Sequence, residues 1–107
     1  MAEAEKLYMA LLERIDRLSK RWCYRYTTLK EYRADIGEFA WWANSYQKDL
    51  SEILKEAKRL YEAKKISYDD YSSIYAHVQT HIDMIKEETK MAINERLEEI
   101  AEKWKTI

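Results

Sequence analysis

His77 and His81 have the spacing of metal ligands, because residues four positions apart lie on one face of a helix. Met84 and Glu88 continue this face, but the chain contains no His-Glu-x-x-His sequence and no Glu-x-x-His pair. Zinc sites in proteins use three or four side-chain ligands, so two histidines supply only part of such a set. We therefore expect no metal and no other cofactor, with His77 and His81 as the candidate ligands if a metal binds.

Cys23 is the only cysteine and hence the only thiol nucleophile of the chain. A nucleophilic cysteine needs a base beside it, and both histidines are far from Cys23 in sequence. The chain also lacks a glycine-rich loop and a convincing acid–base pair, so we expect no catalytic residues and no enzymatic activity. One cysteine excludes an internal disulfide, and a reducing cytoplasmic location is the expected setting.

Basic side chains gather between residues 14 and 33, where seven cations stand against the two acids Asp16 and Glu31. The cations are Arg14, Arg17, Lys20, Arg21, Arg25, Lys30 and Arg33, and the tyrosines Tyr24, Tyr26 and Tyr32 lie among them. The four arginines from 14 to 25 repeat at spacings of three and four, which places them on one helical face. Such a face could follow a phosphate backbone while the tyrosines stack on sugars or unpaired bases.

A second interpretation gives the same arginines a structural role. The carboxyl-terminal part of the chain carries a comparable row of acids, namely Glu88, Glu95, Glu98, Glu99 and Glu102. If the first and third helices run parallel, the two rows lie side by side and form ion pairs that set the register. The sequence favours this pairing over a nucleic-acid surface, because no recognised nucleic-acid motif accompanies the arginines.

Trp41 is the residue best suited to bind another protein. Its neighbour Trp42 adjoins the expected core, and adjacent residues diverge by about 100° on a helix, so Trp41 points elsewhere. The face of Trp41 also carries small or polar residues, Ala34, Gly37, Asn44, Ser45 and Lys48. A glycine within a helix costs about 1 kcal/mol relative to alanine, so we interpret Gly37 as a point of close approach by another helix. These residues form the predicted protein interface.

The elements that carry these residues are predicted to be long helices. The chain has no proline and one glycine in 107 residues, and therefore lacks the residues that make tight turns. Apolar residues recur at spacings of three and four throughout, as in Leu11, Ile15, Leu18 and Trp22. In the last third of the chain the row continues through Ile93, Leu97, Ile100, Trp104 and Ile107, after a stutter near residue 89.

Two breaks divide this pattern into helices at about residues 3–26, 29–64 and 68–106. Thr28 and Glu31 form a capping-box pattern, and paired threonines are poor residues for a helix interior. Ser67 and Asp70 form a second cap pattern, after cations that suit a helix end. The apolar row stays in phase across residues 26–28, however, so the alternative is a two-helix hairpin with one continuous helix over residues 3–64.

We expect one all-α domain over residues 1–107, with three long antiparallel helices in an up-down-up bundle that dimerisation completes. The formal net charge of −1 gives no global attraction to nucleic acid or to an anionic membrane. No apolar run approaches ~18 residues, and we do not expect a secretory signal at the amino terminus. Abundant Lys, Arg and Glu with few amides resembles the composition of thermophile proteins.

The leading hypothesis is a non-enzymatic helical interaction or assembly protein that self-associates and presents a helical surface to a protein partner. The alternative is a nucleic-acid-binding accessory protein of the kind that viruses and plasmids encode, using the basic residues between 14 and 33. The two hypotheses differ in whether those arginines face acidic side chains or solvent.

Overall fold

The computed structural model describes residues 2–105, which form three helices and no strand. Helix α1 spans Glu3–Glu31, α2 spans Ile36–Glu62, and α3 spans Tyr68–Lys105. The prediction of an all-helical chain with three helices is confirmed, and the two-helix alternative is wrong. Residue 106, the predicted end of the third helix, and Ile107, the last member of its predicted apolar row, lie outside the described residues.

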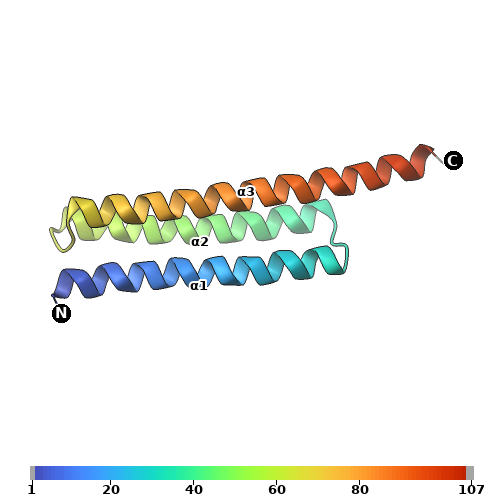
Figure 1. The fold of residues 1–107 in the computed structure, drawn as a ribbon. Helices are drawn as coiled ribbons and strands as arrows, with labels where there is room; N and C mark the ends of the chain where they lie inside the picture. The colour runs from blue at the N-terminus through green and yellow to red at the C-terminus, as the bar shows by residue number, and fades with distance from the viewer. Residues whose placement is uncertain (1, 106–107) are drawn as a thin grey trace.

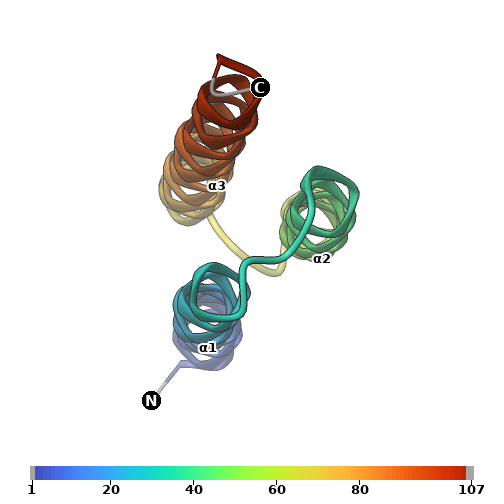
Figure 2. The ribbon, with the colours of Figure 1, turned by 90° about the vertical axis from the view of Figure 1, so that its right-hand side faces the viewer.

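The three helices lie side by side along one axis, and the described chain measures 65 × 19 × 16 Å (Figure 1). Helices α1 and α3 run in the same direction, and α2 runs against both. Viewed from the end, the helices occupy the corners of a triangle, and each helix contacts the other two (Figure 2).

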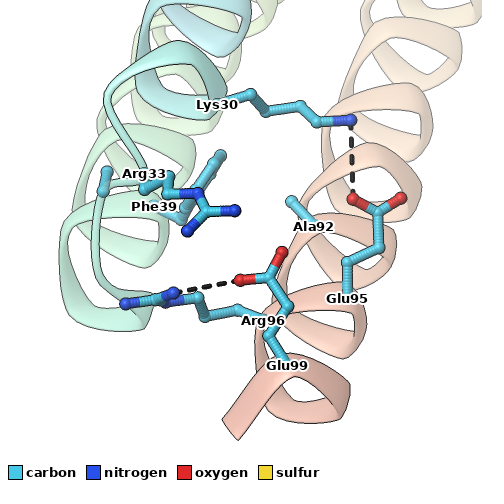
Figure 3. Close-up of a pocket in the computed structure, with 8 residues that line it drawn as sticks. Lys30, Arg33, Phe39, Ala92, Glu95, Arg96 and Glu99 are labelled. Atoms are coloured by element: carbon cyan, nitrogen blue, oxygen red, sulfur yellow. Dashed lines mark hydrogen bonds and ion pairs between the residues drawn. The ribbon is translucent and has the colours of Figure 1, made fainter. Parts of the chain in front are cut away.

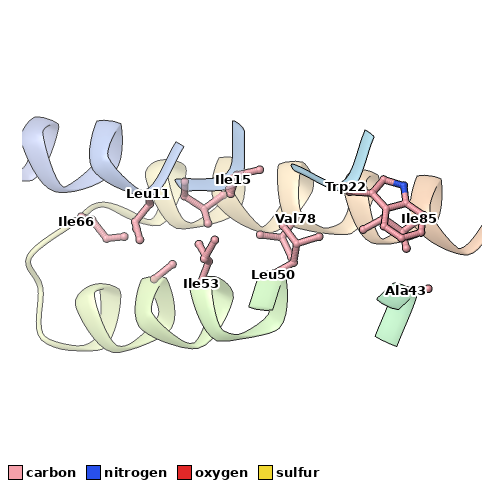
Figure 4. Close-up of a cluster of buried hydrophobic side chains, with 11 residues drawn as sticks. Leu11, Ile15, Trp22, Ala43, Leu50, Ile53, Ile66, Val78 and Ile85 are labelled. Carbon is pink, nitrogen blue, oxygen red and sulfur yellow. The ribbon is translucent and has the colours of Figure 1, made fainter. Parts of the chain in front are cut away.

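Buried apolar residues from all three helices fill the centre of this triangle (Figure 4). They include Leu11, Ile15 and Trp22 of α1, Leu50, Ile53 and Ala57 of α2, and Ile74, Val78 and Ile85 of α3. Full burial of a leucine or isoleucine side chain contributes about 1.5–3 kcal/mol. The repeat of three and four residues therefore gives each helix one apolar stripe, and the three stripes meet in this core.

The predicted break at residues 26–28 is wrong, because α1 continues to Glu31. The hydroxyls of Thr27 and Thr28 donate to the carbonyls of Cys23 and Tyr24, so each threonine bonds back to its own helix and caps none.

The turn between α1 and α2 instead lies at residues 32–35. Arg33 adopts a left-handed conformation with φ of 57°, and the amide of Ala34 donates to the carbonyl of Leu29 across 2.9 Å. This arrangement closes the carboxyl end of α1 in the manner of a Schellman motif. Asp35 then caps α2, because its carboxylate accepts a hydrogen bond from the amide of Glu38 at 2.8 Å.

The second turn lies where its cap pattern indicated. Helix α2 ends at Glu62, Lys64 adopts φ of 60°, and the amide of Lys65 donates to the carbonyl of Leu60. Helix α3 begins at Tyr68, and the hydroxyl of Ser67 accepts from the amide of Asp70 at 3.0 Å. Arg33 and Lys64 thus occupy, in two turns of the same type, the left-handed position that glycine usually takes after a helix.

Helix α3 is much longer than its neighbours and continues past the turn that joins α1 and α2 (Figure 1). Its 38 residues span about 57 Å, whereas the 27 residues of α2 span about 41 Å. We call residues 97–105 the α3 extension. Because the earlier helices have ended, the extension has no helix of this chain beside it.

Candidate interaction surfaces

The arginines of α1 lie mainly opposite acids of α2, not of α3. Arg14 forms an ion pair with Glu56 of α2. Farther along α1, Arg17 and Arg21 line the α1–α2 groove together with Asp49 and Glu52. The pairing predicted with the α3 glutamates is therefore wrong for Arg14. Among residues 2–105, the α1–α3 ion pair that the structure contains joins Lys30 to Glu95 at 3.6 Å.

Arg25 packs against an aromatic ring in place of a carboxylate. Its guanidinium carbon lies 3.9 Å from the centre of the Trp42 ring, within the range of a cation–π contact. The Nε atom of Arg25 is buried and has no hydrogen-bond partner within residues 2–105. Arg25 is therefore a structural residue between α1 and α2 and is not free to bind a phosphate with all its donors.

The other basic and aromatic residues of this region divide between core and surface. Tyr26 packs against Trp22 and Phe39, and Lys20 forms an ion pair with Asp16 of its own helix. Tyr24, by contrast, is 72% exposed. The predicted cations Arg17, Lys20, Arg21, Lys30 and Arg33 are also exposed, although Lys20 and Lys30 form ion pairs.

A small pocket lies where the α1–α2 turn meets α3 (Figure 3). The Lys30–Glu95 ion pair borders one side, and a 3.0 Å pair between Arg96 and Glu99 borders the other. The side chain of Arg33 points into the space between them (Figure 3). Three cations and two acids line the pocket, and two of the cations are ion-paired, so its net positive charge is small.

The predicted interface around Trp41 is only partly brought together. Trp41 is 62% exposed, and its ring lies 4.8 Å from that of Trp42 in an edge-to-face arrangement. Asn44 and Lys48 are exposed, and Ser45 is half-buried. These residues leave an aromatic anchor on the outer face of α2, and Asn44 lines the groove between α2 and α3.

Two members of the predicted interface have other roles. Ala34 lies in the α1–α2 turn, not on α2, and is buried against Leu29 and Phe39. Gly37 is the second residue of α2, so the interpretation as a mid-helix contact point is wrong. A Cβ atom at Gly37 would lie 3.3 Å from the capping carboxylate of Asp35, so the glycine makes room for the cap.

His77 and His81 line a shallow surface pocket of α3. His77 is exposed, and its Nδ1 lies 2.7 Å from the carbonyl of Ser73. Burial, followed by the nearby charge of His77, lowers the pKa of His81 below its ordinary value of 6.5, and Asp16 opposes this shift. Within residues 2–105 no group of three or more histidine, cysteine or acidic side chains has the arrangement of a metal site.

A groove that the sequence interpretation missed runs between α2 and α3. It has a volume of about 330 Å³, and its α2 wall contains the small residues Ala40 and Ala43. Its α3 wall contains Lys86, Thr89, Lys90, Ile93 and Asn94. The hydroxyl of Thr89 is buried without a hydrogen-bond partner within residues 2–105, although an unmade hydrogen bond of this kind costs about 1–3 kcal/mol.

The α3 extension continues the same side of α3 with exposed apolar residues. Leu97, Ile100 and Trp104 follow Ile93 at spacings of four, three and four, and Trp104 is 73% exposed. The sequence interpretation assigned these residues to the core and is corrected here. The sequence could have indicated that these three side chains are exposed, because α3 is longer than α1 and α2. That inference requires the first turn to be placed correctly at residues 32–35.

Comparisons with protein families, with curated proteins and with solved structures found no match to this chain. None of the helices formed by residues 2–105 combines the length and the apolar character needed to cross a membrane.

Proposed function

We propose that this protein is a non-enzymatic helical assembly protein that self-associates and presents a helical surface to a protein partner. The observation that carries the proposal is the α3 extension, on which Leu97, Ile100 and Trp104 form an exposed apolar row. Contiguous exposed apolar side chains commonly mark protein interaction sites.

Light scattering coupled to size exclusion tests self-association directly. We expect the mass of a dimer at micromolar concentration, with dissociation on dilution. A mass of about 13 kDa at every concentration up to the highest soluble one would contradict the self-association half of the proposal.

The outer face of α2 is proposed as the surface for the protein partner. Tryptophan is enriched at interface hot spots, and the exposed ring of Trp41 is already oriented by Trp42. Affinity purification from the source cells should recover a partner with the wild-type chain and lose it with Trp41→Ala. Tyr75→Ala, at another exposed aromatic residue on α3, is the control that should retain it.

Nucleic-acid binding is the second candidate, favoured by one observation. Arg17, Arg21 and Tyr24 are exposed together on α1. The acids Asp49 and Glu52 line the same groove and reduce its positive potential, which is why protein interaction ranks first.

A salt titration of binding to single-stranded DNA or RNA tests this candidate. Phosphate contacts should give a log–log slope of about −0.7 per contact, and each of Arg17→Ala and Arg21→Ala should reduce the slope. No binding at low salt would exclude it.

A further inference from the structure

The α2–α3 groove and the α3 extension share one face of α3. Six residues define this face, Lys86, Lys90, Ile93, Leu97, Ile100 and Trp104, and their spacings are four, three, four, three and four. The first three line the groove, and the last three form the apolar row of the extension. One helix thus carries an open groove and an uncovered apolar segment in immediate succession.

The order of these spacings is the same in both directions along the helix. If a second copy of α3 packs antiparallel against the first, each of the six residues on one copy therefore lies opposite one of the six on the other. We propose that two copies of this chain pair antiparallel through α3, so that the extension of each occupies the α2–α3 groove of the other. The inference rests on the self-association proposed above and names its surface, its orientation and its partner.

The residues brought together in this register are chemically complementary. Ile93 meets Leu97 of the second copy in the apolar centre, on both sides of the two-fold axis. The aliphatic part of Lys90 covers Ile100 of the second copy, as lysine stems do at helix interfaces. Lys86 lies opposite Trp104 of the second copy, where its ammonium group can contact the indole face in a cation–π interaction.

The charges and dimensions agree with this pairing. The charged residues that line the groove, Lys86 and Lys90, are both cations, and neither has an ion-pair partner within residues 2–105. In the antiparallel register Glu98 of the second copy lies within one helical turn of Lys90. The extension comprises nine residues, about 13 Å of helix, and faces an equal length of α3 over residues 86–94.

The α2 wall of the groove leaves space for the incoming side chains. Ala40 and Ala43 project only methyl groups into a groove of about 330 Å³, so leucine and isoleucine can approach the helix backbone closely there, and Asn44 and Gln47 form the polar part of the same wall. Asn94 lies near the proposed two-fold axis, and a single asparagine at a helix seam favours one register over others. Because each copy gives and receives an extension, the contact closes as a two-fold dimer and does not continue into a filament.

Cysteine cross-linking tests the orientation in a Cys23→Ser background, which removes the exposed native thiol. Glu87 and Ala101 flank the proposed contact face, and the antiparallel register places them on the same side of the contact, within one helical turn of each other in the two copies. A mixture of the Glu87→Cys and Ala101→Cys chains should form a disulfide-linked heterodimer, and Ala101→Cys alone should not cross-link. Cross-linking of Ala101→Cys with itself would overturn the antiparallel arrangement.

Substitutions on the extension test the surface. Leu97→Glu and Ile100→Glu should convert the dimer to monomer, and Trp104→Ala should raise the dimer dissociation constant about thirtyfold. Met91→Glu is the matched control at an exposed apolar residue on the opposite side of α3, and it should leave the dimer intact. Circular dichroism should show unchanged helicity in the monomeric variants, because these side chains lie outside the core.

The outcomes separate this inference from the broader proposal. A dimer that survives Leu97→Glu overturns the extension as its contact surface while self-association itself stands. A wild-type chain that is monomeric at all concentrations overturns both.

Discussion

Arg14 of α1 and Glu56 of α2 form an ion pair across the interface of these two antiparallel helices. Seven residues farther along α1 is Arg21, and seven residues back along α2 is Asp49, so the register places this second pair of opposite charges together. Both residues line the α1–α2 groove. Arg14 is therefore paired within the chain, and Arg21 lies in a groove that also contains acids, so the positive potential available to a nucleic acid is reduced.

The Arg14–Glu56 pair should make a small contribution to stability. Both side chains are about 40% exposed, and ion pairs with such exposure contribute roughly 0–1 kcal/mol because water and salt screen them. A double-mutant cycle with Arg14→Ala and Glu56→Ala, measured by urea unfolding, should give a coupling energy in that range. The coupling should fall at 1 M NaCl. A coupling energy above about 2 kcal/mol that does not change with salt would contradict the prediction, because it would require a pair shielded from water.

Arg25 should contribute to stability through its stem and its stacking more than through hydrogen bonds. Arg25→Met keeps an extended apolar side chain against Trp42 and removes the unpaired Nε, so we expect a change within about 1 kcal/mol in the free energy of unfolding. Arg25→Ala exposes the Trp42 ring and should lower the free energy of unfolding by about 1–2 kcal/mol. Equal losses in the two variants would contradict a packing role.

Lys64→Gly should stabilise the protein. Lys64 holds φ of 60°, a conformation that costs an L-residue about 1 kcal/mol and costs glycine nothing. Thermal unfolding should show a higher midpoint for Lys64→Gly and a lower one for Lys64→Val, since a β-branched residue tolerates this conformation least. Lys65→Gly, at the next exposed position, is the control that should not stabilise the protein.

His81 should make stability depend on pH below neutrality. Its pKa in the folded protein is lowered from 6.5, with burial as the main cause, so the unfolded chain binds the proton more readily. The stabilisation is fully present above pH 6.5 and is lost as pH falls from 6.5 through the lower folded pKa. Urea unfolding between pH 5 and pH 8 should show a free energy of unfolding that falls with decreasing pH in the wild type. The dependence on pH should be weaker in His81→Gln.

His77→Gln serves as the comparison for that experiment. Its imidazole is exposed, and its charge disfavours protonation of His81. Removing it should raise the pKa of His81 toward its ordinary value and so make the loss of stability at low pH smaller. A pH slope that is identical in the wild type and in His81→Gln would show that other groups, such as the carboxylates, produce it.

The sequence determined the class of the fold because its signals are local. The absence of proline, the single glycine and the continuous spacing of three and four specify long amphipathic helices whatever surrounds them. Ser67 and Asp70 marked the second turn correctly, because a cap bonds within its own segment. The same local reasoning misplaced the first turn, since the pattern at Thr28 and Glu31 competes with a second cap pattern at Asp35 and Glu38.

Tertiary structure alone decided which surfaces stay open. An arginine row predicts a partner of opposite charge, but whether that partner is Glu56 or a glutamate of α3 depends on which helix faces it. Leu97, Ile100 and Trp104 carry the same periodicity as the buried residues before them, and they are exposed only because α1 and α2 end earlier along the axis. Periodicity specifies a face of a helix, whereas burial requires a neighbour, and the neighbour is set by the lengths and register of the other helices.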